Sequence, residues 1–314
     1  MAQGLLPYLS MNLGKPARLP LQCCFKDCLS LQNSPDSMHI VRKGFYRRSS
    51  DGRRIARFKC RLCRRSFSNA RFSECFGQRR RKLNDPIRRL LVAGVSQRRI
   101  ALLLNTNRKT VVRKFLFLAG QARLRHERFL ESFETPKRNF TALHFDEMES
   151  FERSKCLPVS IPLVVVPETR KILGIRVCSM PAKGLLAQLS RQKYGVRSDG
   201  RAAAAKNLFQ SITKVVHPRV RITSDQNPKY PHWLRARFPQ ARHETTPGRR
   251  GCVVGQGELK SGGYDPLFAL NHTCAMIRAN VNRLFRRTWC TTKRRDRLEA
   301  HLAIYLDFHN TVLT

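Results

Sequence analysis

The amino-acid sequence predicts a mixed α/β protein in which a sheet flanked by helices follows a small cysteine-rich module and an all-α segment. Three observations predict this fold class. Paired cysteines mark the first part (residues 20–80), helical periodicity marks the second (85–135), and alternating strand-like and helix-like stretches mark the third (140–314). The chain has 314 residues, of which 41% are hydrophobic, and this argues against wholesale disorder.

The first part contains two close cysteine pairs. Cys23 or Cys24 pairs with Cys28, and Cys60 and Cys63 form a CxxC pair about thirty residues later. Two such pairs around a glycine-containing, strand-like stretch are typical of a zinc ribbon with four thiolate ligands. A four-residue gap favours Cys23 over Cys24, and the alternative to a structural zinc site is a set of unrelated thiols. The predicted zinc ligands are Cys23, Cys28, Cys60 and Cys63.

The second part predicts a helix-turn-helix. A helix that begins near Pro86 is interrupted by Gly94, after which Ser96 and Asn107 are expected to cap two further helices. Ala101 is small enough for a close approach of the helices. The alternative is a helical hairpin with a solvated basic face. In a helix-turn-helix, the second helix would present four residues to the major groove of DNA: Arg108, Lys109, Thr110 and Arg113.

The third part predicts a sheet. Strand-like stretches at 143–146, 159–166 and 172–178 follow one another as hairpin partners, and a helical stretch then leads to a strand at 220–225. Three strands in hairpin order, a helix and a strand parallel to the first are the order of the ribonuclease-H-like fold. That order would place the ends of the first and fourth strands, with Asp146 and Asp225, side by side although 79 positions separate them.

The charge of the chain indicates its partner. Lys and Arg number 61 against 21 Asp and Glu, a net charge of +40 that is spread over the whole length. Such a field attracts nucleic acid through counterion release, while a ribosome-associated protein or a membrane-surface binder are alternatives. The sequence has no run of about 18 apolar residues and no signal-peptide pattern. We therefore expect no membrane association and a cytoplasmic, nucleoid-associated protein.

Two acids held together in so basic a chain predict a divalent-metal site. Transfer of a phosphodiester builds negative charge on the attacking and leaving oxygens, and two Mg²⁺ ions about 4 Å apart stabilise both. Asp146 is the expected bridging ligand and Asp225 the second. The alternatives are a strand-end acid at Asp146 and an Asx turn before Asn227-Pro228 at Asp225.

The third metal ligand is left open between two residues. Asn271 opens a helical stretch, and Arg278 lies seven residues later on nearly the same face, where it could clamp a phosphate. Glu258 is a competing candidate in a glycine-rich neighbourhood, and a degenerate site is the remaining alternative. We predict Asn271 as the ligand.

Several ordered motifs carry a resemblance to a known family. They are the cysteine pairs, the helix-turn-helix, the stretch HFDEMESF at 144–151, Ser224-Asp225, and the stretch from Asn271 to Thr288. In this order they resemble prokaryotic insertion-sequence transposases with an N-terminal zinc ribbon. Members of that superfamily use an Asp-Asp-Glu triad, and some branches have Asn in third place with a basic residue seven later. Arg278 departs from the more usual Lys at that position.

The resemblance implies a DNA transposase that binds terminal inverted repeats and target DNA and catalyses metal-dependent cleavage and strand transfer. Synapsis of two DNA ends implies a homo-oligomer on DNA. Two other functions compete with this expectation. One is a non-catalytic DNA-binding protein derived from a transposase, and the other is a nuclease or resolvase that lacks strand transfer.

Overall fold

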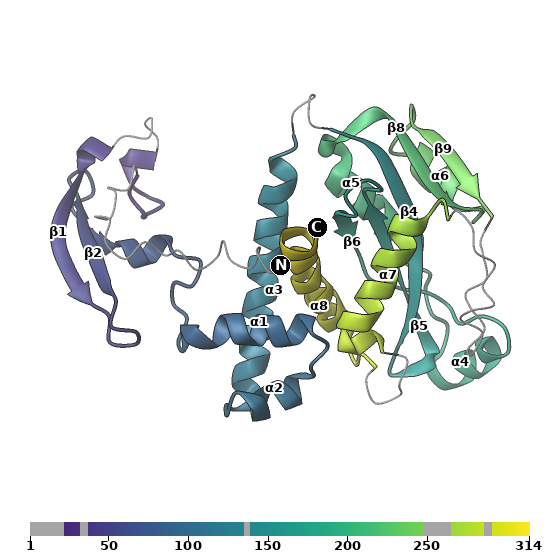
Figure 1. The fold of residues 1–314 in the computed structure, drawn as a ribbon, viewed down its shortest axis with the longest axis horizontal. Helices are drawn as coiled ribbons and strands as arrows, with labels where there is room; N and C mark the ends of the chain where they lie inside the picture. The colour runs from purple at the N-terminus through teal and green to yellow at the C-terminus, as the bar shows by residue number, and fades with distance from the viewer. Residues whose placement is uncertain (1–21, 32–36, 135–138, 248–264, 286–290) are drawn as a thin grey trace, which may run out of the picture. The chain divides into compact units, whose positions relative to one another are not determined.

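The computed structural model describes residues 22–31, 37–134, 139–247, 265–285 and 291–314. The chain divides into two compact units, Met1–Lys82 and Leu83–Thr314 (Figure 1). The prediction of a mixed α/β protein with a mixed sheet flanked by helices is confirmed. Both the helical segment and the sheet segment lie in the second unit.

The first unit is built on a small antiparallel sheet of order β1-β2-β3. Its strands are β1 (Ile40–Arg47), β2 (Arg54–Cys60) and β3 (Ser66–Ser68). Short 3₁₀ turns lie at Leu29–Leu31, Ser37–His39, Asn69–Phe72 and Arg81–Leu83. The apolar centre is small and consists of Ile40, Phe58 and Phe67 packed against buried cysteines. A core of this size needs additional cross-linking, as small domains generally do.

Three helices open the second unit. They are α1 (Asn84–Val92), α2 (Gln97–Leu103) and α3 (Arg108–Glu131). The caps predicted from the sequence are present, because the Ser96 hydroxyl accepts from the Arg99 N–H (3.4 Å) and the Asn107 side chain accepts from the Lys109 N–H (2.8 Å). Gly94 has φ +75°, and a Cβ there would lie 2.9 Å from the Phe285 ring. The turn between α1 and α2 therefore requires glycine for both conformation and space.

The second unit contains a six-stranded mixed sheet. The strands run in the order β6-β5-β4-β8-β9, and β7 pairs with β5. β4 pairs antiparallel with β5 and parallel with β8, which in turn pairs parallel with β9. The strands are β4 (Phe140–Glu152), β5 (Ser154–Val165), β6 (Ile172–Ile175), β7 (Cys178–Ser179), β8 (Val216–Asp225) and β9 (Arg242–Thr246).

Helices cover both faces of this sheet (Figure 1). On one face, Leu143 and Phe145 of β4 pack against Leu208 and Phe209 of α5. On the other face, alternate residues of β5 such as Ile161 share a core with α7 and with the opening helices. The remaining helices are α4 (Leu186–Tyr194), α5 (Arg201–Ile212), α6 (Tyr230–Arg235), α7 (Phe268–Asn280) and α8 (Arg295–Phe308), with 3₁₀ turns at Thr213–Val215 and Asn282–Leu284 and a final π-turn at His309–Leu313.

The long helix α3 is tied to α8. The two pack along each other in Figure 1, and Arg125 of α3 binds both carboxylate oxygens of the buried Asp307 of α8, with Nη2–Oδ2 at 2.8 Å and Nε–Oδ1 at 3.0 Å. Since α8 also shares the apolar core with α1 and α7, the opening helices are part of the same packed body as the sheet.

Candidate functional site

Four cysteines of the first unit come together at one point. Their sulfur atoms all lie within 4.8 Å of one another, with 3.7 Å between Cys23 and Cys63 and 3.7 Å between Cys28 and Cys60. Four thiolates arranged tetrahedrally at a Zn–S distance of about 2.3 Å would stand about 3.8 Å apart. The cluster therefore has the size that one metal ion such as zinc requires. Cys24 lies outside this group.

Local turns and hydrogen bonds place these sulfur atoms. The Cys28 N–H donates to the Phe25 carbonyl and the Cys60 N–H to the Arg65 carbonyl, each at 3.0 Å. The Ser30 hydroxyl donates to the Cys28 sulfur (3.2 Å). Burial raises the pKa of Cys23. At Cys28, burial is outweighed by hydrogen bonds from Ser30, and the pKa falls to about 6. At Cys63, burial is likewise outweighed by hydrogen bonds from Arg65, which lower its pKa, so two sulfur atoms of the cluster favour the thiolate form, which is the form that binds a metal.

Asp146 and Asp225 lie opposite each other on neighbouring parallel strands. β4 and β8 pair in register up to His144 and Thr223, and each aspartate follows two residues later on its own strand. Adjacent strands are about 4.8 Å apart. Because side chains alternate along a strand, Asp146 points to the same face as Met148, which is the face that α7 covers. The sheet therefore brings together the two acids that the sequence paired.

The surroundings of Asp146 oppose its ionisation. Burial raises its pKa to about 6, and the negative charge of Asp225 acts in the same direction. Two hydrogen bonds to Asp146 Oδ1 partly offset this, one from the Glu147 N–H (2.7 Å) and one from the Tyr230 hydroxyl (2.9 Å). Such a pair of half-buried acids is stabilised when a cation is added.

Asn271 lies in the first turn of α7, and its side chain is exposed. Its amide nitrogen donates to Asp265 Oδ2 (2.9 Å), while Asp265 Oδ1 accepts from the Leu267 N–H (2.9 Å). This hydrogen bond identifies the nitrogen of the amide, so the Asn271 oxygen remains able to accept a hydrogen bond or to bind a cation. The α7 helix packs on β4 and β5, and the charge of Asp146 acts on Cys274, one turn after Asn271.

Arg278 lies two turns after Asn271 on α7 and is half-buried. It lines a pocket with residues of β4 and β5 rather than forming an ion pair with a described acid. Glu258, the other candidate for the third ligand, lies outside the described residues. Within the described part of the chain, the four cysteines are the only group of three or more His, Cys, Asp or Glu side chains close enough to share a metal ion.

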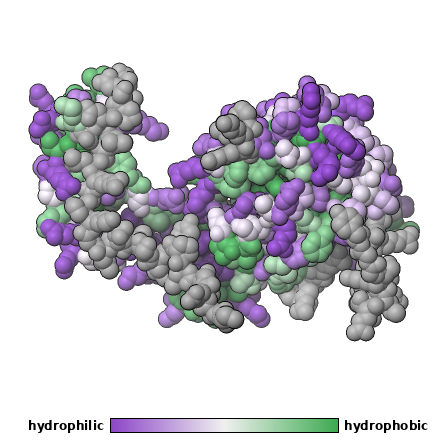
Figure 2. All heavy atoms as spheres, turned by 45° about the horizontal axis from the view of Figure 1, so that its top comes forward, coloured by the Kyte–Doolittle hydropathy of each residue, from purple (hydrophilic) through white to green (hydrophobic). Residues whose placement is uncertain are grey.

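The four residues predicted to face DNA begin α3. Arg108, Lys109 and Arg113 are exposed, and Thr110 is half-buried. Arg98 and Arg99 on α2 are exposed as well and enlarge the basic surface. The face of the molecule shown in Figure 2 is rich in hydrophilic side chains among its described residues. The basic surface on α2 and at the start of α3 can bind anions, and its charge alone does not select one class of anion.

Three side chains near the acids were not predicted from the sequence: Tyr230, Ser160 and Asp265. Tyr230 donates to both Asp146 and Glu147 Oε2 (3.3 Å), and Glu147 also accepts from the Ser160 hydroxyl (2.6 Å). Asp265 orients Asn271 from six residues upstream. The turn Gln226-Asn227-Pro228 after β8 was a signal that a short helix could fold back onto the strand ends. Nothing in the local pattern indicated where the Tyr230 hydroxyl would point.

Comparison with known proteins gives no family. No protein-family model matches the chain, and no curated protein matches it significantly. Among the described residues, no helix is both long and apolar enough to cross a membrane.

Proposed function

We propose that this protein binds DNA and cleaves and joins its strands by phosphodiester transesterification, as an insertion-sequence transposase does. One observation carries the proposal. Asp146, in the middle of β4, and Asp225, at the end of the parallel strand β8, stand opposite each other in a chain whose net charge is +40. A strongly basic protein that holds two acids side by side has the composition expected of a metal-dependent enzyme acting on a polyanion.

The residues of the pair fit hard divalent cations such as Mg²⁺. Carboxylate oxygens from Asp146 and Asp225 would hold two ions, which supply stabilisation of charge on the attacking and leaving oxygens. Asn271 is the third ligand in this proposal, and it would bind through its amide oxygen because its amide nitrogen donates to Asp265. Tyr230 holds the Asp146 carboxylate in one orientation through its hydroxyl.

Strand order supports a ribonuclease-H-like catalytic domain. Three strands in antiparallel order, β6-β5-β4, are followed by β8 and β9 parallel to β4, with helices on both faces. In the ribonuclease-H-like order the acids belong to the first and fourth strands, which correspond here to β4 and β8. Asp225 ends β8, whereas Asp146 lies in the middle of β4, which continues to Glu152.

The DNA-binding part of the proposal uses the two N-terminal elements. The α2 and α3 helices act as a helix-turn-helix, in which Arg108, Lys109, Thr110 and Arg113 contact the major groove. The four-cysteine cluster holds a structural zinc ion and folds the first unit as a ribbon. Binding of two DNA ends requires two copies of the chain, so the working form in this proposal is a homo-oligomer on DNA.

A second function is a DNA-binding protein that has lost catalysis. It is favoured by the lack of a third acidic ligand beside Asp146 and Asp225 among the described residues. Such a protein would keep the basic surface of α2 and α3 and the cysteine cluster. The two functions differ in whether DNA is cut, and they share DNA binding.

The deciding experiment measures cleavage and joining of labelled duplexes made from the DNA that flanks the gene. Wild type is compared with Asp146→Asn, Asp225→Asn and Asn271→Ala, with Mg²⁺ and without added divalent metal. Asp296→Asn is the matched control, because Asp296 is an acid of α8 engaged with Arg294 (2.8 Å). Binding is followed separately by gel shift.

We expect Mg²⁺-dependent cutting and joined products with wild type and the control. Both aspartate variants should bind DNA and cut at less than about one hundredth of the wild-type rate, and Asn271→Ala should lose about 10- to 100-fold. Equal binding by all five proteins with no cutting by any of them would instead establish the non-catalytic function.

A further inference from the structure

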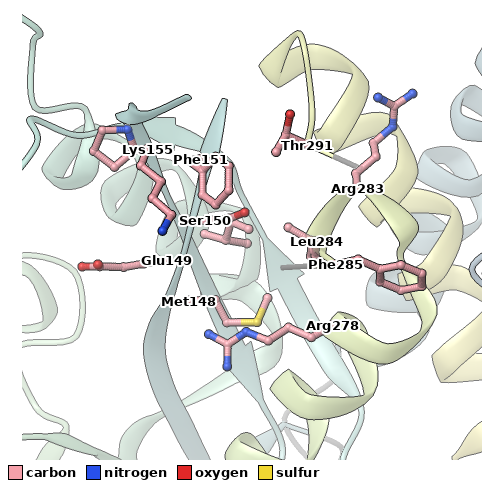
Figure 3. Close-up of a pocket in the computed structure, with 12 residues that line it drawn as sticks. Met148, Glu149, Ser150, Phe151, Lys155, Arg278, Arg283, Leu284, Phe285 and Thr291 are labelled. Carbon is pink, nitrogen blue, oxygen red and sulfur yellow. The ribbon is translucent and has the colours of Figure 1, made fainter. Parts of the chain in front are cut away.

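A pocket of about 490 Å³ lies against the part of β4 that follows Asp146 (Figure 3). One wall comes from the second half of β4 and the start of β5, and the other comes from the end of α7 and the segment that follows it. Its lining residues are Met148, Glu149, Ser150, Phe151, Lys155, Pro158, Ile161, Arg278, Arg283, Leu284, Phe285 and Thr291. This volume is in the range of pockets that bind small organic groups.

The pocket joins apolar and aromatic walls to cationic groups. Phe151 on β4 supplies an aromatic ring and Met148 forms part of the floor, while the Phe285 ring turns away from Phe151 toward Gly94. Arg278 extends from α7 toward Met148 in Figure 3, and Lys155 projects from β5 into the same space. The Arg283 guanidinium instead turns toward the Phe115 ring of α3, at 5.7 Å from the ring centroid.

The pocket carries positive charge that no acid of its described lining neutralises. Neither Arg278 nor Lys155 forms a hydrogen bond or ion pair with another described residue. The acid of the lining, Glu149, binds Lys183 outside the pocket (2.7 Å). A flat ring system stacked on Phe151 would place an attached anion within reach of these two cations. A purely apolar ligand would leave them without a partner.

The pocket is lined by residues that follow the candidate metal ligands on the same strand and the same helix. Met148 follows Asp146 by two residues on the same face of β4, a distance of about 7 Å along a strand. Arg278 follows Asn271 by seven residues on α7, about 10 Å along a helix. One wall of the pocket is therefore a direct continuation of the strand that carries Asp146.

We propose that this pocket binds one unpaired nucleotide of a DNA strand whose neighbouring phosphodiester lies at Asp146 and Asp225. The base stacks on Phe151, and its phosphate binds Lys155 and Arg278. The assignment of a DNA strand rests on the proposed function. A free nucleotide would fit the same shape and charge, and the experiment distinguishes it from a nucleotide within a DNA strand.

The experiment uses the full chain without added divalent metal, so that binding is measured apart from cleavage. Duplexes of one sequence are prepared blunt and with a short single-stranded overhang that carries the fluorescent base 2-aminopurine. Wild type is compared with Phe151→Ala and Lys155→Ala. Lys206→Ala, an exposed lysine on α5 over the opposite face of the sheet, and Tyr194→Ala, an exposed aromatic residue on α4, are the matched controls.

We expect wild type and both controls to bind the overhang duplex more tightly than the blunt duplex and to change the 2-aminopurine fluorescence. Phe151→Ala should weaken overhang binding by about 5- to 100-fold and leave blunt binding unchanged. Lys155→Ala changes an exposed side chain that the fold does not depend on, and it should also weaken the overhang complex selectively. Thermal unfolding checks that each variant is folded.

The proposal is overturned if wild type binds both duplexes equally, or if the pocket variants lose both kinds of binding to the same extent. Competition by free dAMP that abolishes the preference at equal nucleotide concentration would overturn the assignment to a strand. If cleavage is found but the overhang preference is not, only the pocket assignment fails. If the preference and its loss in Phe151→Ala are found without cleavage, the failure belongs to the proposed catalysis.

Discussion

His301 of α8 is a titratable side chain enclosed in the helical core. It is 1% exposed, its Nε2 lies 3.0 Å from the Leu91 carbonyl, and its ring meets Phe115 edge-on. Burial lowers its pKa to about 4 from an ordinary value of 6.5. Between pH 4 and pH 6.5 the His301 imidazole is protonated in the unfolded chain and neutral in the folded chain. Stability is therefore fully present above pH 6.5 and declines as the pH falls toward 4.

This shift predicts the pH dependence of a histidine variant. His301→Gln removes the titration, so the variant should lose less stability than wild type between pH 6.5 and pH 4. The difference should approach about 3 kcal/mol, the free energy of a shift of this size. Urea unfolding at several pH values measures it, and His232→Gln, at an exposed position, should follow wild type. If the free energies of unfolding of wild type and His301→Gln fall equally with pH, folding does not lower the pKa of His301.

At the scale of elements, the short strand β6 lies at the edge of the sheet, and the π-turn His309–Leu313 that follows α8 covers this edge. The Asn310 side chain accepts from the Ile172 N–H (2.9 Å) and donates to the Ile172 carbonyl (2.8 Å), as a neighbouring strand would. His309 lies 2.9 Å from the Arg170 carbonyl. The turn after α8 thus takes the place of a neighbouring strand at Ile172 and keeps the sheet edge paired.

Removing this substitute should destabilise the second unit. Asn310→Ala leaves the buried N–H and carbonyl of Ile172 without partners, at a cost of about 2–4 kcal/mol in the free energy of unfolding. Thr311→Ala is the matched control, because Thr311 is exposed at the next position, and it should cost less than about 1 kcal/mol. Chemical denaturation measures both. Equal small effects would mean that water replaces the side chain at this edge.

For the whole molecule, the two compact units predict separate stabilities. In the first unit the apolar centre is small, so bound zinc should supply much of its folding free energy. Cys60→Ser should lose the metal and give fast amide exchange in β1, β2 and β3, while β4 and β5 remain protected. Hydrogen exchange by mass spectrometry, with zinc content measured in parallel, checks this. Cys24→Ser should keep both metal and protection, and loss of zinc in that variant would reassign the ligand.

The charge of the whole chain predicts strongly salt-dependent DNA binding. The logarithm of the association constant should fall linearly with the logarithm of salt concentration, with a slope of about −0.9 for each phosphate contact. Arg113→Ala should reduce this slope by about 1 if the side chain contacts a phosphate. Fluorescence anisotropy over a salt series measures it, with Lys206→Ala as the control. An unchanged slope and affinity for Arg113→Ala would remove the start of α3 from the DNA-binding surface.

Much of the fold could be predicted because its signals are local. Two-residue alternation identified the strand that carries Asp146, and the polar residues Ser96 and Asn107 identified two helix starts. Cysteine spacing identified the cluster. β9 was not predicted, because its residues Arg242–Thr246 are polar and half-exposed, and only pairing with β8 makes them a strand.

The sequence by itself determined the charge of the chain, the cysteine set, the helix caps and the strands that carry the two acids, since each depends on residues close together along the chain. It did not determine that the strand of Asp146 continues to Glu152. The tertiary structure decided what surrounds the acids. Tyr230 reaches Asp146 from 84 positions away, α7 covers the face that Asp146 points to, and the wall opposite β4 forms a pocket with it. These contacts depend on how distant elements pack, and no local pattern contains the depth or angle at which two surfaces meet.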